Sequence, residues 1–103
     1  LAQSSRNLYL STDERRAAGA LYAALHRASV RVSVGALPAD VRAEAHALLM
    51  AAGFKSVDYI ALVDPDTLGA LPDDAPMAPG TARLLGAAWL GRTRLIDNIS
   101  VSR

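Results

Sequence analysis

Residues 81–101 read TARLLGAAWLGRTRLIDNISV, and this stretch decides the expected fold. Two largely apolar runs flank Gly91-Arg92, and a two-residue connection with glycine first favours a tight β-hairpin with a type II′ turn. If the residues on either side of the turn pair, the register of the whole hairpin follows: Leu90 with Thr93, Ala88 with Leu95, Gly86 with Asp97, Leu84 with Ile99 and Ala82 with Val101. One face of this hairpin is then aliphatic except at Asp97.

The other face of the hairpin carries Arg83, Leu85, Trp89, Arg94 and Asn98. Because Trp89 lies opposite Arg94 in this register, we expect a cation–π pair between them.

Asp97 is the one carboxylate on the apolar face. A buried carboxylate needs hydrogen-bond donors, so we expect Asp97 to be largely buried and bonded to backbone amides. The space over Gly86 is expected to be open and to let a helix or loop amide approach. The pattern predicts a structural anchor here, since no partner acid or base accompanies Asp97.

A first helix is expected to begin at Ser11, with Glu14 as the third-residue partner of a capping box. Apolar residues then recur at helical spacing as far as about Ser29: Ala18, Leu21, Tyr22, Leu25 and Ala28 or Ser29. Residues 30–34 alternate in the manner of a strand, but they could equally form a frayed link to the next helix.

A second helix is expected to begin at Pro38, which suits a first helical turn, and to end before Gly53 in the left-handed conformation. Its expected buried stripe is Val41, Ala45, Leu48, Leu49 and Ala52.

Residues 56–63 are rich in β-branched and aromatic residues, which predicts a strand. Asp64-Pro65-Asp66 predicts a turn that can open a single helical turn through Leu68, and residues 69–80 predict a surface loop with Met77 as a packing anchor. The expected fold class is α+β: two helices packed on one face of a small, mostly antiparallel three-stranded sheet.

The composition narrows the class of protein. A chain of 103 residues is long enough for one domain, and 51% apolar with 20% charged residues is typical of a folded globule. The absence of cysteine excludes a disulfide scaffold, a thiolate zinc site and cysteine catalysis. The longest apolar run, residues 47–54, is far short of the roughly 20 residues of a membrane-spanning helix, so no membrane partner is expected.

The formal net charge of +1 gives no electrostatic indication of nucleic-acid binding. The charge is uneven along the chain, however: +3 in residues 1–36, −5 in residues 37–80 and +3 in residues 81–103. These segments could be ordinary solvated faces, or the basic N-terminal end could face an anion. His26 and His46 lack ligand-spaced neighbours and predict no metal site.

The strongest candidate site lies in residues 1–7, LAQSSRN. Serine hydroxyls, backbone amides and the guanidinium of Arg6 are the donors that hold phosphate groups. Such stretches are also common in ordinary loops, so composition alone does not decide between the two.

Residues 1–7 with Tyr9-Leu10-Ser11 and Glu14-Arg15 resemble the GLAMSSRNxYLxxxER junction of the pantothenate synthetase (pantoate–β-alanine ligase) family. Asp58-Tyr59 with Asp64 resembles that family's VDYxxxxD strand. Residues 83–99 are similar to its RLLxAARLGxTRLIDNI hairpin. The resemblance covers essentially the whole chain in order.

The resemblance implies a cytoplasmic, usually dimeric enzyme related in fold to class I aminoacyl-tRNA synthetases. Such an enzyme uses ATP and Mg²⁺ to convert pantoate to pantoyl adenylate, and β-alanine then displaces AMP to give pantothenate. Residues 1–103 match only the smaller C-terminal lid domain, with residues 1–10 as the KMSKS-like interdomain loop. The resemblance implies that the N-terminal Rossmann-like domain, with the HIGH-type histidines, the pantoate pocket and most ATP contacts, is absent from this chain. A chain that begins at Leu1 fits such a fragment.

Carried over by position, Gln3, Ser4, Ser5 and Arg6 are the expected ATP-contacting segment, and Gln3 stands where the family has methionine. No catalytic residue and no metal ligand is expected in the fragment. It should bind no cofactor and be inactive alone, because pantoate and β-alanine are held by the missing domain.

The alternative is a stand-alone interaction or dimerisation module without ATP. Its contact surface would be the hairpin face that carries Arg83, Trp89, Arg94 and Asn98.

Overall fold

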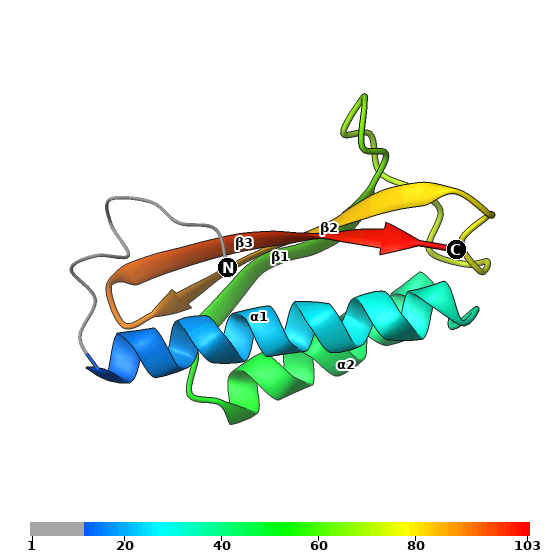
Figure 1. Cartoon of the computed structure of the whole chain (residues 1–103). Coiled ribbons are helices and arrows are strands. Elements are labelled where there is room, and N and C mark those ends of the chain that lie inside the picture. The colour runs from blue at the N-terminus through cyan, green and yellow to red at the C-terminus, as the bar shows by residue number, and fades with distance from the viewer. Residues whose placement is uncertain (1–11) are drawn as a thin grey trace.

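The structure, a computed structural model, describes residues 12–103. The elements follow in the order α1 (Thr12–Ser33), α2 (Pro38–Ala51), β1 (Ser56–Val63), β2 (Thr81–Leu90) and β3 (Thr93–Ser102). The strands form one antiparallel sheet in the order β1-β2-β3. Both helices lie on the same side of this sheet (Figure 1), which confirms the α+β prediction.

Helix α1 buries a stripe that is almost the expected one: Ala17, Ala18, Leu21, Ala24, Leu25, Ala28, Ser29 and Val32. Tyr22 was expected in the stripe but is 40% exposed, so that prediction is wrong. The helix also continues to Ser33, so residues 30–33 are helical rather than a strand or a frayed link, and only Val34 lies in the connection to α2. The reason is tertiary packing, since Val32 is 1% exposed within the core and this burial outweighs the local β-propensity.

Helix α2 begins at Pro38 and is followed by Gly53, whose φ of 101° confirms the predicted left-handed end. Its buried residues are Pro38, Val41, Ala45 and Leu49. Leu48 and Ala52 are exposed, so the predicted stripe was too wide. Helix α2 packs against α1 and β1 through a narrow face only, so the residues on either side of that face remain exposed.

The hairpin has the predicted register at every pair, from Leu90 with Thr93 to Ala82 with Val101. Gly91 has a φ of 59°, which a turn with glycine first requires. Strand β1 joins the other edge of β2, with a bulge between Val57 and Tyr59.

Asp97 is 5% exposed, and its Oδ1 accepts a hydrogen bond of 2.8 Å from the backbone amide of Asn98, as predicted. The prediction of open space over Gly86 is wrong. A Cβ at Gly86 would lie 3.1 Å from Cδ2 of Leu25 and 3.4 Å from Cδ1 of Leu21. A larger residue at this position would have to displace these leucines, because helix α1 packs directly on the sheet there.

Residues 64–80 form a loop at the opposite end of the sheet from the hairpin turn (Figure 1). Oδ1 of Asp64 accepts the amides of Asp66 at 2.8 Å and Thr67 at 3.0 Å, which gives the predicted turn. Met77 is 7% exposed and confirms the predicted packing anchor. The carbonyl of Met77 also accepts a hydrogen bond of 2.5 Å from Arg103.

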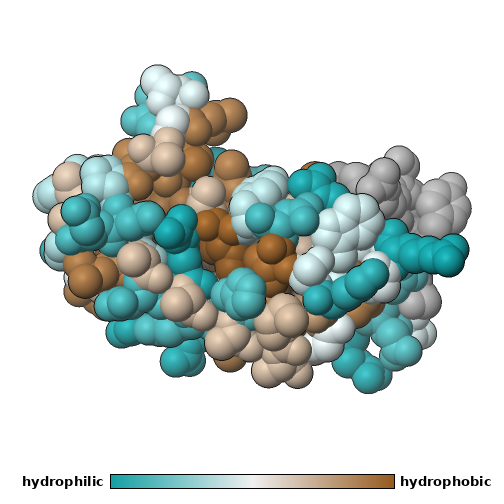
Figure 2. All heavy atoms as spheres, turned by 180° about the vertical axis from the view of Figure 1, so that it is seen from behind, coloured by the Kyte–Doolittle hydropathy of each residue, from teal (hydrophilic) through white to brown (hydrophobic). Residues whose placement is uncertain are grey.

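Seen from behind, hydrophilic and hydrophobic residues are mixed over the surface, and hydrophobic ones gather in its middle and beneath the loop that projects at the top (Figure 2). A hollow of about 240 Å³ lies beneath the loop of residues 64–80, with lining residues that include Leu62, Leu71, Pro76 and Met77.

Candidate functional site

The four predicted ATP-contacting residues, Gln3 to Arg6, lie outside the described residues, as does the predicted cap at Ser11. The structure does show where that segment joins the rest of the domain. Helix α1 begins at Thr12, at the same end of the molecule as the turn between β2 and β3 and the loop between α2 and β1 (Figure 1). We call this end, with Glu14, residues 55–58 and residues 91–94, the hairpin end.

The first turn of α1 is bonded to the hairpin at this end. The hydroxyl Oγ1 of Thr93 donates a hydrogen bond to Oε2 of Glu14, and the two residues are 79 positions apart in the sequence. Sequence reasoning missed this contact. The available signal was that both residues fall in the stretches that carry the family resemblance, ER at residues 14–15 and TRLIDNI at residues 93–99.

A second cluster of hydrogen bonds at the hairpin end is centred on Asp58. Its two carboxylate oxygens each lie 3.1 Å from Nε1 of Trp89, and Oδ2 accepts a bond of 2.8 Å from Nε of Arg94. The guanidinium of Arg94 lies over Tyr59, 6.0 Å from the ring centroid. The predicted cation–π pair between Trp89 and Arg94 is therefore wrong, because both side chains donate to the same carboxylate, a stronger interaction than ring stacking.

These contacts bring together the three separate stretches on which the resemblance rests. Glu14 belongs to the first stretch, Asp58 to the second, and Thr93 with Arg94 to the third. The bond of Glu14 lies on the helix-covered face of the sheet and that of Asp58 on the opposite face, both at the hairpin end.

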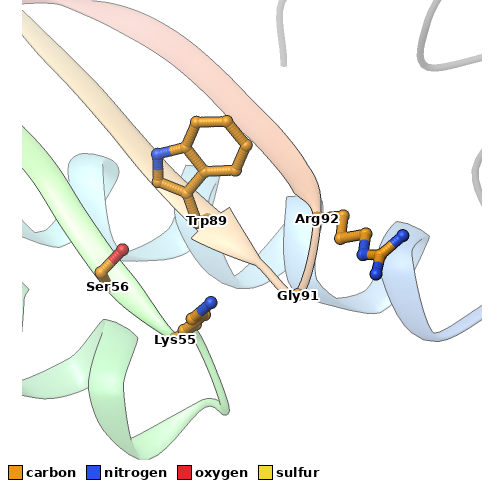
Figure 3. Close-up of a pocket in the computed structure, with 5 residues that line it drawn as sticks. All are labelled: Lys55, Ser56, Trp89, Gly91 and Arg92. Atoms are coloured by element: carbon orange, nitrogen blue, oxygen red, sulfur yellow. The ribbon is translucent and has the colours of Figure 1, made fainter.

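A shallow open hollow of about 400 Å³ lies beside this cluster, lined by Lys55, Ser56, Trp89, Gly91 and Arg92. In Figure 3, the amine of Lys55 lies between β1 and the hairpin turn, whereas the guanidinium of Arg92 extends away from Trp89 on the other side of the turn. The ion pairs within residues 12–103 involve neither Lys55 nor Arg92. The hairpin end therefore offers positive charge to an approaching anion.

The described residues at the hairpin end contain no cysteine and no histidine, and His26 and His46 are exposed on the two helices. Within residues 12–103, no group of three or more His, Asp or Glu side chains is placed to hold a metal ion. This end can bind and position an anionic group.

The carboxylates with shifted pKa values lie elsewhere. The hydrogen bond from Arg31 lowers the pKa of Glu44, and the two are joined by an ion pair of 2.7 Å. The amides of Thr67 and Asp66 lower the pKa of Asp64. Both shifts come from contacts that hold helices or a loop in place, so these carboxylates are structural.

Comparison with known proteins gives the family. The family model described as Pantoate-beta-alanine ligase matches residues 1–100 of the chain. The chain belongs to this family. The match extends over the SSRN segment and the hairpin alike.

Named members of the pantoate–β-alanine ligase family agree over the same length. Pantothenate synthetase of Hyphomonas neptunium is 62% identical over 104 residues, covering 100% of this chain and 36% of its own length. The enzyme of Sphingopyxis alaskensis is 48% identical over 101 residues, covering 98% of this chain and 35% of its own. The crystal structure of pantothenate synthetase from Thermus thermophilus has a TM-score of 0.76 and 38% identity, covering 96% of this chain and 34% of that one.

The chain thus spans about 36% of the length of the first of these relatives and matches their C-terminal part.

Among residues 12–103, neither helix combines the length and apolar character that crossing a membrane would require.

Proposed function

We propose that this chain is the C-terminal lid domain of a pantothenate synthetase and grips the phosphates of ATP in the full-length enzyme. That enzyme would activate pantoate as pantoyl adenylate, releasing pyrophosphate, and would then join β-alanine to it with loss of AMP. The observation that carries the proposal is the family match over residues 1–100, which includes LAQSSRN and leaves about two thirds of the relatives' length outside the chain. This match favours the enzyme over a stand-alone interaction module.

Ser4, Ser5 and Arg6 would stabilise the charge that develops on the leaving pyrophosphate, as preorganised donors do. Gln3 would contribute its backbone to the same loop. Closure of the domain over the site would also keep water from the labile acyl adenylate.

The positive charge of Lys55 and Arg92 supports this role, because both residues lie at the hairpin end, where helix α1 also begins. Residues 12–103 offer no cluster of carboxylates for Mg²⁺. We therefore assign the ligands of the ion that accompanies ATP to the phosphates and to the N-terminal domain. That domain would also hold pantoate and β-alanine, and the full-length enzyme would be a cytoplasmic homodimer.

The test joins this chain to the N-terminal part of the Hyphomonas neptunium relative, in place of that enzyme's own matching segment. We expect the joined enzyme to form AMP only in the presence of ATP and pantoate and to form pantothenate when β-alanine is added. Each part alone should be inactive. A well-folded joined enzyme without either activity would contradict the proposal, and the unmodified relative is the matched control.

A further inference from the structure

We infer that the hydrogen bond between Thr93 and Glu14 is a clasp that positions the start of helix α1, and with it the phosphate-gripping segment. Thr93 is thus a positioning residue for the first half-reaction. The inference rests on the proposed function of residues 3–6, and it assigns to Thr93 and Glu14 a role in that function.

The clasp joins two elements that are each fixed independently. Thr93 is the first residue of β3, directly after the tight turn at Gly91-Arg92, and it pairs with Leu90 across the hairpin. Glu14 lies in the first turn of α1, whose later residues Leu21 and Leu25 are fully buried against the sheet. A hydroxyl donating to a carboxylate is a strong, charge-assisted bond, and both residues are only half-buried.

The contacts continue beyond the clasp into the sheet. Arg94, the residue after Thr93, is bonded to Asp58 on β1 at 2.8 Å. Thr93 and Arg94 point to opposite faces of the sheet, so the start of β3 is bonded to α1 on one face and to β1 on the other. Residues 1–11 join the domain at Thr12, two residues before Glu14.

This position explains why the clasp affects function more than folding. Helix α1 keeps its buried stripe without it, so the core does not depend on one half-exposed bond. The first turn of α1, however, sets the point from which Arg6 must reach the phosphates. Misplacement of a reacting group by about 1 Å can cost roughly 100-fold in rate.

The decisive variants change only the hydroxyl. Thr93→Val removes the donor and keeps the shape, whereas Thr93→Ser keeps the donor and serves as the matched control. In the joined enzyme we expect Thr93→Val to slow adenylate formation about ten-fold and to raise the KM for ATP. Without the charge-assisted bond, the start of α1 no longer holds residues 3–6 in one position relative to the phosphates. Reaction of preformed pantoyl adenylate with β-alanine should change much less, and Thr93→Ser should stay within about two-fold of wild type in both steps.

A second readout uses the chain as it stands. In ¹H–¹⁵N spectra of residues 1–103, Thr93→Val should shift the amides of residues 12–15 and speed their hydrogen exchange, while Thr93→Ser should leave them near their original positions. If Thr93→Val folds poorly, the cycle of Thr93→Ala with Glu14→Gln replaces it: the effect of changing both partners should be less than the sum of the single effects.

The outcomes separate the clasp from the proposed function. Equal kinetics of Thr93→Val and Thr93→Ser, alongside a slow Arg6→Ala enzyme, would overturn the clasp and leave the proposed function standing. Normal adenylate formation in both Thr93→Val and Arg6→Ala would overturn the proposed function itself. Slow adenylate formation in Thr93→Val, rescued by serine and accompanied by the amide shifts, supports the clasp.

Discussion

The two ends of the sheet use their polar side chains differently. At the hairpin end, Glu14, Asp58 and Arg94 connect separate motifs, while Lys55 and Arg92 are left without ion pairs among residues 12–103. We call the opposite end, made of residues 64–80 with Arg42 and Arg103, the loop end. There the polar contacts tie a long connection down, as when Arg42 bonds Asp73 at 2.6 Å and Arg103 bonds the carbonyl of Met77.

From this difference we expect the hairpin end to carry function. A proline-rich connection without regular structure needs local contacts to hold it, and the loop end supplies them from its own acids and nearby arginines. The two-residue turn at the hairpin end needs no such support, so its charged side chains remain available for another molecule. Substitutions at the hairpin end, and in the segment that leaves it, should therefore impair catalysis, whereas those at the loop end should impair stability.

The largest effect is expected for Arg6→Ala in the joined enzyme. Removing one charged donor from the developing pyrophosphate should slow adenylate formation by roughly 10²–10³-fold. The attack of β-alanine on preformed pantoyl adenylate should change much less, as measured by rapid-quench assays of the two half-reactions. The stability of the 103-residue chain should stay within about 0.5 kcal/mol. Equal slowing of both steps would assign Arg6 to domain closure instead.

Met77→Ala is the matching test at the loop end. Met77 is 7% exposed, so truncation should leave a cavity and lower the free energy of unfolding by about 2–5 kcal/mol. Urea unfolding of the chain measures this loss. In the joined enzyme, at a temperature where it stays folded, adenylate formation should remain within about two-fold. A large catalytic defect without a loss of stability would reverse the assignment of the two ends.

Between the two ends, Asp97→Ala tests the buried carboxylate on the helix-covered face. Because Asp97 accepts the amide of Asn98 at 2.8 Å, its loss should destabilise the chain by about 1–3 kcal/mol. A variant that melts within about one degree of wild type would show that this carboxylate is no anchor.

The smallest effect is expected at Asp64, and it depends on pH. The amides of Thr67 and Asp66 lower the pKa of Asp64 in the folded chain. Ionised Asp64 therefore stabilises the folded chain fully at any pH above the ordinary pKa of aspartate. This stabilisation is lost as the pH falls through the lowered pKa of Asp64 in the folded chain. Asp64→Ala should have a slightly lower melting temperature than wild type at pH 7, and this difference should disappear in acid. A difference that grows in acid would contradict the assignment of the lowered pKa to the amide hydrogen bonds.

Much of the fold could be predicted because a few residues fix it locally. Gly91-Arg92 sets the register of ten strand pairs, and Gly53 marks the end of α2. The errors concern how elements lie on one another. The exposure of Tyr22 depends on the rotation of α1 over the sheet, and the leucines over Gly86 depend on how closely that helix approaches. Neither is encoded in a local pattern.

The candidate site was only partly predictable for the same reason. Gln3, Ser4, Ser5 and Arg6 came from a resemblance of sequence, and their contacts remain a prediction. The bond between Glu14 and Thr93 joins residues 79 positions apart, and it exists only once α1 is seated on the sheet. The bonds of Asp58 to Trp89 and Arg94 depend on the bulge in β1, which no residue pattern indicated.

The most direct test of the central claim is a titration of the joined enzyme with ATP, in which only this chain carries ¹⁵N. We expect the backbone amides of Ser4, Ser5 and Arg6 to shift as nucleotide binds, while the loop-end amides of residues 73–78 stay in place. Amides of Ser4, Ser5 and Arg6 that all remain unshifted at millimolar ATP would contradict it.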